Sequence, residues 1–504
     1  MALVLHSHMP YVEGFGTWPF GEEWLWEAVA TVYLPMLDLL EGSDAAVTVG
    51  LTPVLCDQLE TLSGPAGERL LAFLSGTRRA VHEEDSRGLE DTGQPELAAE
   101  VRRAGQDYIR AEDVLRDGGR QPLERLAALA ERPHVELMTS SATHALLPLL
   151  ASDAGLRLQL ASGVASHERR FGAWPGALWL PECAYAPGLE HELADHGVRR
   201  FCVDQTEVHG LGAPEQLEPV ATAAEVVAVP IDWQTVQLVW SGTHGYPAHP
   251  VYRDYHRRTV HDLRPWSNGG EPYRHDQAAA LAREHARDFV TRCAERLDRH
   301  RADVGRPGLL TFALDTELLG HWWYEGQTWL GAVFDEASSQ GLDLVTLEEG
   351  VDRVPAVPRE VRSSSWGDGK DFSTWDRPEV AEIAFDARSA ELRTVAAAAQ
   401  GGPVAPGRRA ALERAARELL ALQSSDWAFQ VTNDLAADYP QRRMAGHAAA
   451  HDAALNGLDG CLEGSRSHQE SGRDARSGYP PAALPEPALR NLAPDLDLAP
   501  LLTP

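Results

Sequence analysis

Lysine is nearly missing from this sequence: Lys370 is the only one in 504 residues, and arginine supplies the other basic side chains. The acidic residues still outnumber the basic ones by 75 to 45, which gives a formal net charge of −30. No dense cluster of basic residues interrupts this excess. Such a charge repels phosphate backbones and anionic lipids. We therefore expect no nucleic-acid partner and no membrane partner, and a neutral substrate is favoured.

Cysteines and long apolar runs are scarce too. The five cysteines are scattered, their number is odd and none forms a CxxC pair, so the pattern predicts neither a disulfide framework nor a zinc knuckle. The N-terminus lacks the basic and apolar segments of a signal peptide, and no run of about 18 apolar residues occurs. These absences predict a cytoplasmic protein, and the sequence calls for no cofactor.

The pattern of the chain predicts its fold class. Its 504 residues, 43% of them hydrophobic, can form two or three domains, or one barrel with attachments. Short apolar stretches alternate with helical periodicity. The expected strands lie at 2–8, 45–53, 134–140, 177–185, 199–204, 226–240 and 308–314, and the clearest helices at 22–40 and 277–300. This alternation predicts an α/β fold whose parallel sheet is closed, or nearly closed, into a barrel.

Three segments depart from the alternation. Residues 62–131 have charged helical periodicity and no strand signal, and we interpret them as a helical insertion in a catalytic domain of residues 1–376. Residues 377–462 show helical patterns only, which predicts a C-terminal α-helical domain. Residues 463–504 are rich in Pro, Ser and Arg without periodicity and are predicted to be a disordered tail.

Polar side chains stand at the carboxyl ends of four expected strands. A parallel barrel gathers its functional groups there, because the βα loops converge on one mouth. The four groups are HSHMP with His6 and His8, SSATHALLP with His144, WLPECAY with Glu182, and ALDTELLGHWWYEG with Asp315, Glu317 and His321. Their coincidence predicts a single site formed from several strands.

His6 and His8 point to the same side of their strand, since side chains alternate with a period of two. The pair could bind a metal ion or could donate hydrogen bonds to a polar ligand. One ring could also be buried against backbone carbonyls. Spacing alone does not choose among these interpretations.

Glu182 and Asp315 each follow an apolar strand. Both carboxylates would therefore enter a partly desolvated cleft, where a shifted pKa is easily arranged. Either acid alone could be structural. Two carboxylates from different strands in one cleft are what glycosyl transfer requires, and with the three histidines nearby the pair predicts a catalytic site.

The tryptophans indicate the class of ligand. Sugar rings have C–H faces that pack on aromatic rings and hydroxyls that take polar partners. The tryptophans in loop-like polar contexts are Trp322, Trp323, Trp366, Trp375 and Trp427, whereas Trp174, Trp179 and Trp240 are interpreted as core residues. The combination predicts a carbohydrate-binding cleft.

Six segments resemble, in this order, the conserved regions of glycoside hydrolase family 57, most closely those of its 1,4-α-glucan branching enzymes. They are LHSHMPYV, TWPFGEEWLWEA, ATHALLPLL, WLPECAY, ALDTELLGHWWYEG and SSSWGDGKDFSTW. The resemblance spans residues 1 to about 462. It implies an incomplete (β/α)7 barrel with a helical insertion and a C-terminal helical domain, which agrees with the segments above.

The resemblance also implies roles for single residues. Glu182 resembles the catalytic nucleophile and Asp315 the general acid/base of a retaining double displacement, with α-1,4-glucan as donor and acceptor and a 6-hydroxyl as the branching point. Retention implies carboxyl groups about 5 to 5.5 Å apart. The residues expected to bind the glucan are His6, His8, His144, Trp24, Tyr246, His321, Trp322, Trp366, Trp375, Asp426 and Trp427. The resemblance implies no metal.

The segment 240–258 resembles the mobile catalytic loop of the family, with Tyr246 as its tip residue. It departs from the family pattern at AHP, and the neighbouring PIDW also looks altered. Such a loop excludes water from the site. The departures leave the ratio of branching to hydrolysis open.

Other functions remain to be weighed. A 4-α-glucanotransferase or an α-amylase-type hydrolase would use the same two carboxylates. A metal-dependent polysaccharide deacetylase would hold a divalent ion at His6 and His8, and the long WLPECAY match argues against it. A noncatalytic glucan-binding protein would have no need of both Glu182 and Asp315.

Overall fold

A curled sheet carries the site, and the computed structural model describes residues 1–17, 19–117, 121–400, 406–463 and 491–502. The strand order is β8-β1-β2-β3-β4-β5-β7-β6-β9, and its first seven strands pair in parallel. They are β1 Ala2–Ser7, β2 Val47–Leu51, β3 Val135–Ser140, β4 Ala177–Trp179, β5 Arg200–Val203, β7 Val227–Pro230 and β8 Thr311–Asp315. The edge is completed by β6 Val220–Ala221, antiparallel to β7, and β9 Val357–Pro358.

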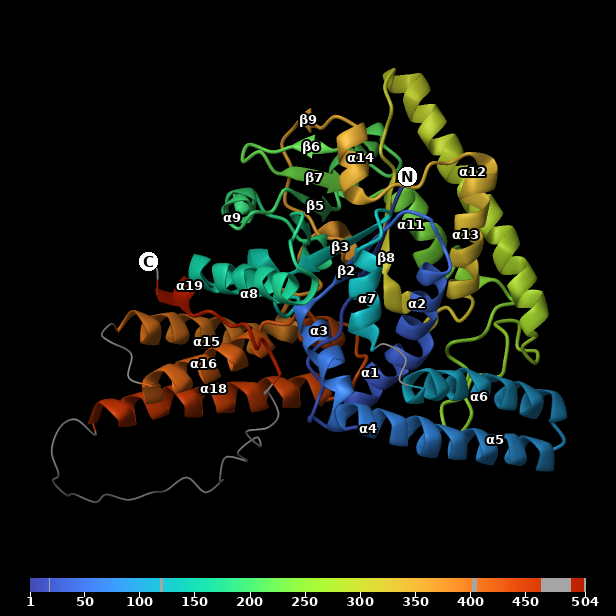
Figure 1. The fold of residues 1–504 in the computed structure, drawn as a ribbon, viewed down its shortest axis with the longest axis horizontal. Helices are drawn as coiled ribbons and strands as arrows, with labels where there is room; N and C mark the ends of the chain where they lie inside the picture. Colours follow the sequence, from blue (N-terminus) through green and yellow to red (C-terminus); the bar gives the residue numbers. More distant parts are fainter. Residues whose placement is uncertain (18, 118–120, 401–405, 464–490, 503–504) are drawn as a thin grey trace.

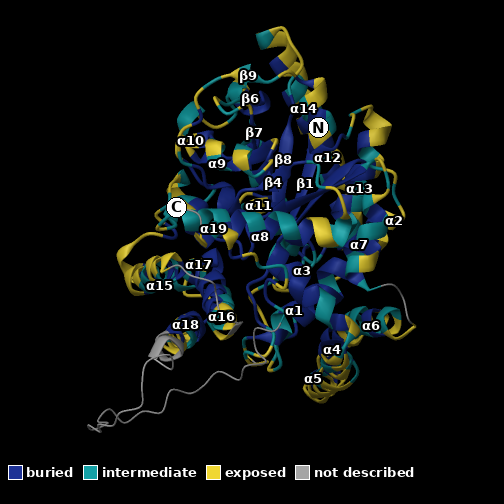
Figure 2. Cartoon of the chain, turned by 60° about the vertical axis from the view of Figure 1, so that its left-hand side comes forward, coloured by how far each residue is buried: buried dark blue, intermediate teal, exposed yellow. Residues whose placement is uncertain are grey.

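The two sides of this sheet nearly meet. The Asp232 N–H, just after β7, donates to the Thr311 carbonyl of β8 at 2.9 Å, although β7 and β8 form no ladder among the described strands. Every residue of β1, β2 and β3 is buried, as parallel strands covered on both faces are (Figure 2). The fold is an incomplete (β/α)7 barrel, which confirms the predicted fold class.

Helices cover the outside of the barrel (Figure 1). They are α1 Glu22–Ala28, α2 Leu34–Glu41, α8 Asp153–Phe171, α9 Leu189–Asp195, α10 Thr206–His209, α11 Trp233–Trp240, α12 His275–Val304, α13 Gly326–Gln340 and α14 Leu347–Arg353. Among the described helices of the whole chain, none is both long and apolar enough to cross a lipid bilayer.

The strand expected over 226–240 is wrong in its second half. β7 ends at Pro230, and α11 begins at Trp233. Val236 and Val239 are both buried, three residues apart on one side of α11. Apolar residues at this spacing suit a helix, and an apolar run of this length had concealed the change of period.

The described part of residues 62–131 is helical, as its charge pattern predicts. Its helices follow α3 Pro53–Glu60 and are α4 Pro65–Ala72, α5 Arg79–Asp91, α6 Pro95–Arg116 and α7 Pro122–Ala130. Proline opens α3, α4, α6 and α7, the position where its missing N–H costs least. α5 and α6 pack together as an arm at the lower right of Figure 1.

A second group of helices lies beside the barrel, at the lower left of Figure 1. It contains α15 Ala381–Ala399, α16 Pro406–Leu422, α17 Ser425–Thr432 and α18 Tyr439–Glu463. Buried hydrogen bonds tie it to the barrel: Arg443 donates to the Tyr11 carbonyl at 2.6 Å, and Thr143 donates to the Leu420 carbonyl at 2.5 Å. The C-terminal helical domain is present as expected, and its boundary at residue 376 stays a prediction.

The disordered tail predicted for 463–504 is wrong for residues 491–502. Leu492, Leu498 and Leu501 are buried against the helical domain, and α19 Ala499–Leu502 packs on α8 and α15. The Ala493 N–H also donates to Asp57 Oδ2 at 2.8 Å. The order of this short segment depends on tertiary contacts, which composition does not reveal. The rest of the tail lies outside the described residues.

We predict that the leucines of this segment contribute to stability according to their burial. Leu492→Ala removes a fully buried side chain and should lower the free energy of unfolding by about 2–5 kcal/mol. Leu502→Ala is the matched control, because Leu502 is 50% exposed, and it should change stability by less than about 0.5 kcal/mol. Denaturant unfolding compares the two, and equal effects would contradict the packing.

Candidate active site

β1 and β8 place the first two groups of the site side by side. His6 lies in β1 opposite Asp315 of β8 and opposite Gly50 of β2. Gly50 leaves room for the ring, because a Cβ at this position would lie in tight contact, 3.2 Å from His6 Nδ1. His8 follows two residues later, so the strand alternation turns both histidines to the same side.

Two further groups follow β3 and β4 in unusual backbone conformations. His144 has φ 57°, Glu182 has φ 61°, and Cys183 has φ 50°. Residues other than glycine rarely adopt this left-handed region, and strained backbone of this kind is concentrated at functional sites. The structure therefore holds the backbone at His144 and Glu182 in conformations that free peptides would avoid.

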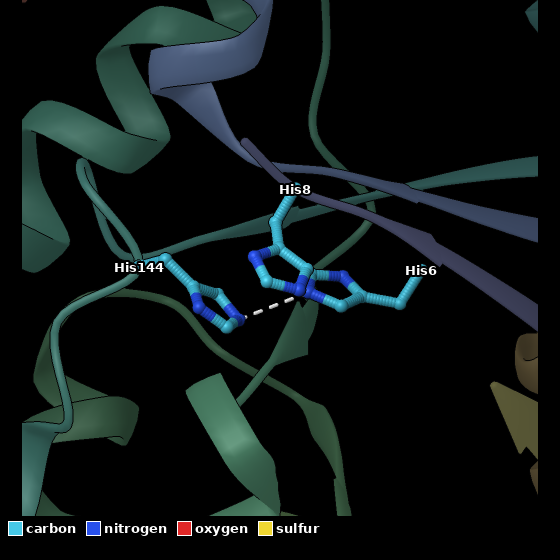
Figure 3. Close-up of side chains that lie close together, drawn as sticks. All are labelled: His6, His8 and His144. Carbon is cyan, nitrogen blue, oxygen red and sulfur yellow. Dashed lines mark hydrogen bonds between the residues drawn. The ribbon is translucent and has the colours of Figure 1, made fainter. Parts of the chain in front are cut away.

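The three histidines form a stack (Figure 3). The ring centroids of His8 and His144 are 4.2 Å apart, those of His6 and His144 5.0 Å, and those of His6 and His8 5.3 Å, with interplanar angles between 12° and 22°. His6 Nε2 lies 3.0 Å from His144 Nε2. His6 also stacks on Trp179, with centroids 4.6 Å apart.

This stack is poorly arranged for a metal ion. Candidate ligand atoms of the three rings lie within 4.8 Å of one another. Imidazole lone pairs lie in the ring planes and must converge on a bound ion, but the Nε2 atoms of His6 and His144 face each other at 3.0 Å, and the nitrogens of His8 face carboxyl groups. The geometry favours the hydrogen-bonding interpretation of the histidines, and that no metal binds here stays a prediction.

Glu182 receives hydrogen bonds from two directions. The Trp366 indole N–H donates to Oε2 at 2.7 Å, and the Ser425 hydroxyl donates to Oε1 at 2.9 Å. Ser425 Oγ lies 2.9 Å from His144 Nδ1 and accepts from it, since its own proton goes to Glu182. The glutamate, 6% exposed, is thereby fixed by one loop and by the first residue of α17.

The surroundings of the hydrogen-bonded histidines determine which ring nitrogens carry protons. Burial, together with the charge of His8, holds the pKa values of His6 and His144 well below the usual range, so both rings are neutral. A neutral His144 that donates from Nδ1 accepts at Nε2. The shared proton of the His6–His144 pair therefore belongs to His6.

His8 is the charged member of the stack. Its Nδ1 lies 3.3 Å from Asp426 Oδ1 of α17, and its Nε2 lies 3.7 Å from Asp315 Oδ1 of β8. Burial alone would lower the pKa of His8, but Asp426, Asp315 and Glu317 together raise it well above its usual value. The resulting imidazolium lies between the Asp426 carboxylate and the carboxyl group of Asp315, which belong to different parts of the fold.

The environment gives the two expected catalytic acids different roles. Burial raises the pKa of Asp315 to about 8, and Glu317, Glu182 and Asp426 add to that rise while His8 opposes it. Burial also raises the pKa of Glu182, but His8, Trp366 and Ser425 act against the shift. Asp315 can therefore carry a proton at neutral pH, whereas Glu182 has the hydrogen bonds that favour its anion. Such a divergence separates an acid from a nucleophile.

Five of the expected glucan-binding residues lie at these carboxylates: His6, His8, His144, Trp366 and Asp426. Trp375 and Trp427 are nearly buried, at 4% and 1% exposed, and both border a small cavity. Trp427 donates from its indole to the Ala421 carbonyl at 2.8 Å, and Trp375 packs with Leu146 and Ala184. Their packing supports the surrounding segments, and their contact with a glucan stays a prediction.

Trp24 and Tyr246 contact helices outside this cluster. Trp24 packs edge-on against Tyr439 of α18, with centroids 5.4 Å apart. The Tyr246 hydroxyl donates to Asp288 of α12 at 2.6 Å, and its ring stacks on His285 at 4.5 Å. The expected loop tip is thus directed at α12 and not at the carboxylates.

His321 and Trp322 lie beside Tyr255. Burial lowers the pKa of His321 to about 3, so the ring is neutral. Trp322 is 45% exposed and stacks on Tyr255, with centroids 4.5 Å apart. Its open face is the kind of surface on which a sugar ring packs.

The sequence analysis missed Ser425, and it gave Trp179 only a core role. Ser425 is the first residue of α17 and follows the N-cap Ser424; two serines ahead of an acid, as in SSDW, were an available signal for a helix start. Trp179 is fully buried as expected, but it also supports His6. Trp240, also expected in the core, is 47% exposed.

We predict that Ser425 helps to keep Glu182 ionised. Ser425→Ala removes a hydrogen bond to the carboxylate, which should raise the pKa of Glu182 and move the acidic limb of kcat/KM for amylose, the expected substrate, to higher pH. Ser424→Ala is the matched control, because Ser424 donates to Asp426 at 2.7 Å instead. It should leave the Glu182 limb in place, and an unmoved limb in Ser425→Ala would contradict the assignment.

Comparison with known proteins agrees with this geometry. Residues 2–361 match the model of glycosyl hydrolase family 57, and residues 387–469 match that of the 1,4-alpha-glucan branching enzyme C-terminal region. A probable 1,4-alpha-glucan branching enzyme of Mycobacterium tuberculosis is 35% identical over 488 residues, which cover 89% of this chain and 90% of that protein. A 1,4-alpha-glucan branching enzyme of Thermococcus kodakarensis is 32% identical over 511 residues, covering 91% and 73%.

A solved structure extends the likeness to three dimensions. The GH57-type branching enzyme from Pyrococcus horikoshii superposes with a TM-score of 0.89 and 29% sequence identity, over 100% of this chain and 96% of that one. Both the sequence match and the superposition cover the barrel and the helical domain. The chain therefore belongs to glycosyl hydrolase family 57.

Proposed function

We propose that this protein is a 1,4-α-glucan branching enzyme that works by a retaining double displacement. The observation that carries the proposal is the pair of carboxylates in unlike environments, Glu182 with two hydrogen-bond donors and Asp315 with its raised pKa. The match of residues 387–469 to the branching-enzyme C-terminal region favours branching within the family.

In the first half of the reaction a bond of the donor glucan is exchanged for a bond to the enzyme. Glu182 attacks the anomeric carbon while Asp315 gives its proton to the leaving glycosidic oxygen. In the second half, Asp315 takes the proton of an acceptor 6-hydroxyl, whose oxygen displaces Glu182. Both steps invert the anomeric carbon, so the α configuration is retained, which requires carboxyl groups about 5 to 5.5 Å apart.

The histidine stack supports these steps by its charge and by its hydrogen bonds. His8 is an imidazolium beside Asp315, and a positive charge there stabilises the Asp315 carboxylate that remains after proton donation. Neutral His6 donates to His144, which donates to Ser425. Ser425 in turn donates to Glu182. This fixed network places the nucleophile before the substrate arrives.

The expected substrate is an uncharged glucan. A net charge of −30 does not penalise a neutral polymer, and the open face of Trp322 offers a stacking surface. We propose α-1,4-glucan as both donor and acceptor, in the cytoplasm as the sequence predicts.

Linkage analysis of amylose after incubation with the protein tests the proposal. We expect new α-1,6 linkages and loss of iodine colour, with few new reducing ends. Reducing ends without α-1,6 linkages would mean an α-amylase-type hydrolase, and redistributed α-1,4 chains alone would mean a 4-α-glucanotransferase. Either result would overturn the branching assignment.

Substitution of the two acids tests their roles in the same assay. Glu182→Gln removes the nucleophile and should abolish transfer, while Asp315→Asn removes proton transfer and should lower kcat by about 10²–10⁴-fold. Both variants keep the size of the side chain, so glucan binding should persist. Undiminished transfer by either variant would mean that another residue performs its step.

A further inference from the structure

The single lysine of the chain lies in the loop that carries Trp366. This loop, residues 362–376, follows β9 and is called the Trp366 loop below. It contains Lys370, whose side chain is 14% exposed. In a sequence that otherwise uses arginine, a nearly buried lysine points to a site with specific requirements.

The Lys370 ammonium is in contact with three electron-rich groups. Its Nζ lies 3.0 Å from Asp204 Oδ2, 3.0 Å from the centroid of the Trp233 ring and 3.2 Å from the Trp366 carbonyl oxygen. Asp204 follows β5 and is fully buried, and Trp233 begins α11. The ammonium therefore connects the Trp366 loop to the residue after β5 and to the first residue of α11.

A compact ammonium suits this arrangement, and a guanidinium does not. The three neighbours are a carboxylate, a carbonyl and a π face, which an ammonium can meet in three directions from one atom. A guanidinium that stacks on a ring directs its donors within its own plane, so it cannot meet a π face, a carboxylate and a carbonyl from one atom. The geometry explains why lysine occupies this position.

The backbone on either side of Lys370 closes the turn that holds Trp366. The Lys370 N–H donates to the Gly367 carbonyl at 3.1 Å, and the Ser365 N–H donates to the Lys370 carbonyl at 3.1 Å. Lys370 itself has φ 57°, a conformation that costs energy and needs contacts to hold it. The ammonium supplies such contacts.

Trp366 in turn contacts the expected nucleophile twice. Its backbone N–H donates to the Glu182 carbonyl at 2.8 Å, and its indole N–H donates to Glu182 Oε2 at 2.7 Å. The Trp366 carbonyl, one peptide unit away from these groups, is the one held by Lys370. A displacement of Lys370 would therefore be transmitted to the nucleophile through a single residue.

We propose that Lys370 is a positioning residue for glycosyl transfer: its ammonium, held by Asp204, Trp233 and the Trp366 carbonyl, fixes the Trp366 indole against Glu182. The role rests on the proposed function in so far as Glu182 is the nucleophile. The Lys370 ammonium contacts the Trp366 carbonyl and not the Glu182 carboxylate, so we expect its loss to change the rate of the chemical step and not glucan binding.

Kinetics of three variants test this role. Lys370→Met and Lys370→Arg should each lower kcat about tenfold, the effect of weakening one hydrogen bond to a charged group, with KM within about twofold of the wild type. The double variant Asp204→Asn/Lys370→Met removes the buried carboxylate charge that Lys370→Met alone would leave unpaired. It should regain the wild-type melting temperature while kcat stays low.

Two kinetic outcomes would overturn the proposal. Full kcat in the double variant would mean that Lys370 only neutralises Asp204, and full kcat in Lys370→Arg would mean that any cation suffices. If Lys370→Met alone does not fold, the kcat of the double variant still tests the positioning role. The rate of glucan cleavage serves as the readout, so a wild type that cleaves but forms no α-1,6 linkages would end the branching proposal and leave this test intact.

A spectroscopic test needs no turnover. Labelling lysine with ¹³C at the ε carbon gives one side-chain signal, because Lys370 is the only lysine. Its ε protons should lie upfield of those of free lysine, since the ammonium sits over the face of Trp233, and Trp233→Leu should return them. A wild-type signal at the free-lysine position would contradict the arrangement.

Discussion

The imidazolium of His8 between Asp315 and Asp426 is the interaction on which the site depends. It joins β1, β8 and α17 through one ring, with distances of 3.7 Å and 3.3 Å to the two carboxylates. Because charges so close together in a partly buried place need partners, His8 permits two acids to approach the same cleft. Burial, with the charge of His8 adding to it, lowers the pKa values of the neighbouring His6 and His144 rings and keeps them neutral.

The site is completed by the helical domain and not by the barrel alone. Ser425 and Asp426 begin α17 and contact Glu182 and His8, while the Trp366 loop closes the other side of Glu182. The barrel supplies the two acids and the histidines. The Trp366 loop and the start of α17 supply the hydrogen bonds and the charge that influence how those groups are protonated. This division gives a physical reason for the barrel and the helical domain to pack through buried hydrogen bonds.

Local pattern was enough to find the strand ends, and therefore Glu182, Asp315 and the histidines. It was not enough for Ser425, which meets Glu182 across 243 positions of sequence, or for Tyr246, whose direction depends on Asp288 of α12. Trp375 and Trp427 were expected to face the glucan because their surroundings are polar, but packing of the loop and of α17 buries them. Residues 491–502 acquire order from the surface that they cover, which composition cannot report.

The most direct test of this account is the protonation state of His8 in the folded protein. With ¹⁵N-labelled histidine, the spectrum of the wild type minus that of His8→Gln isolates this ring. The account predicts an imidazolium at pH 7.5, because the Asp426 carboxylate in particular raises its pKa, and a lower pKa in Asp426→Asn. A neutral His8 ring at that pH in the wild type would contradict the claim that it holds the two carboxylates together.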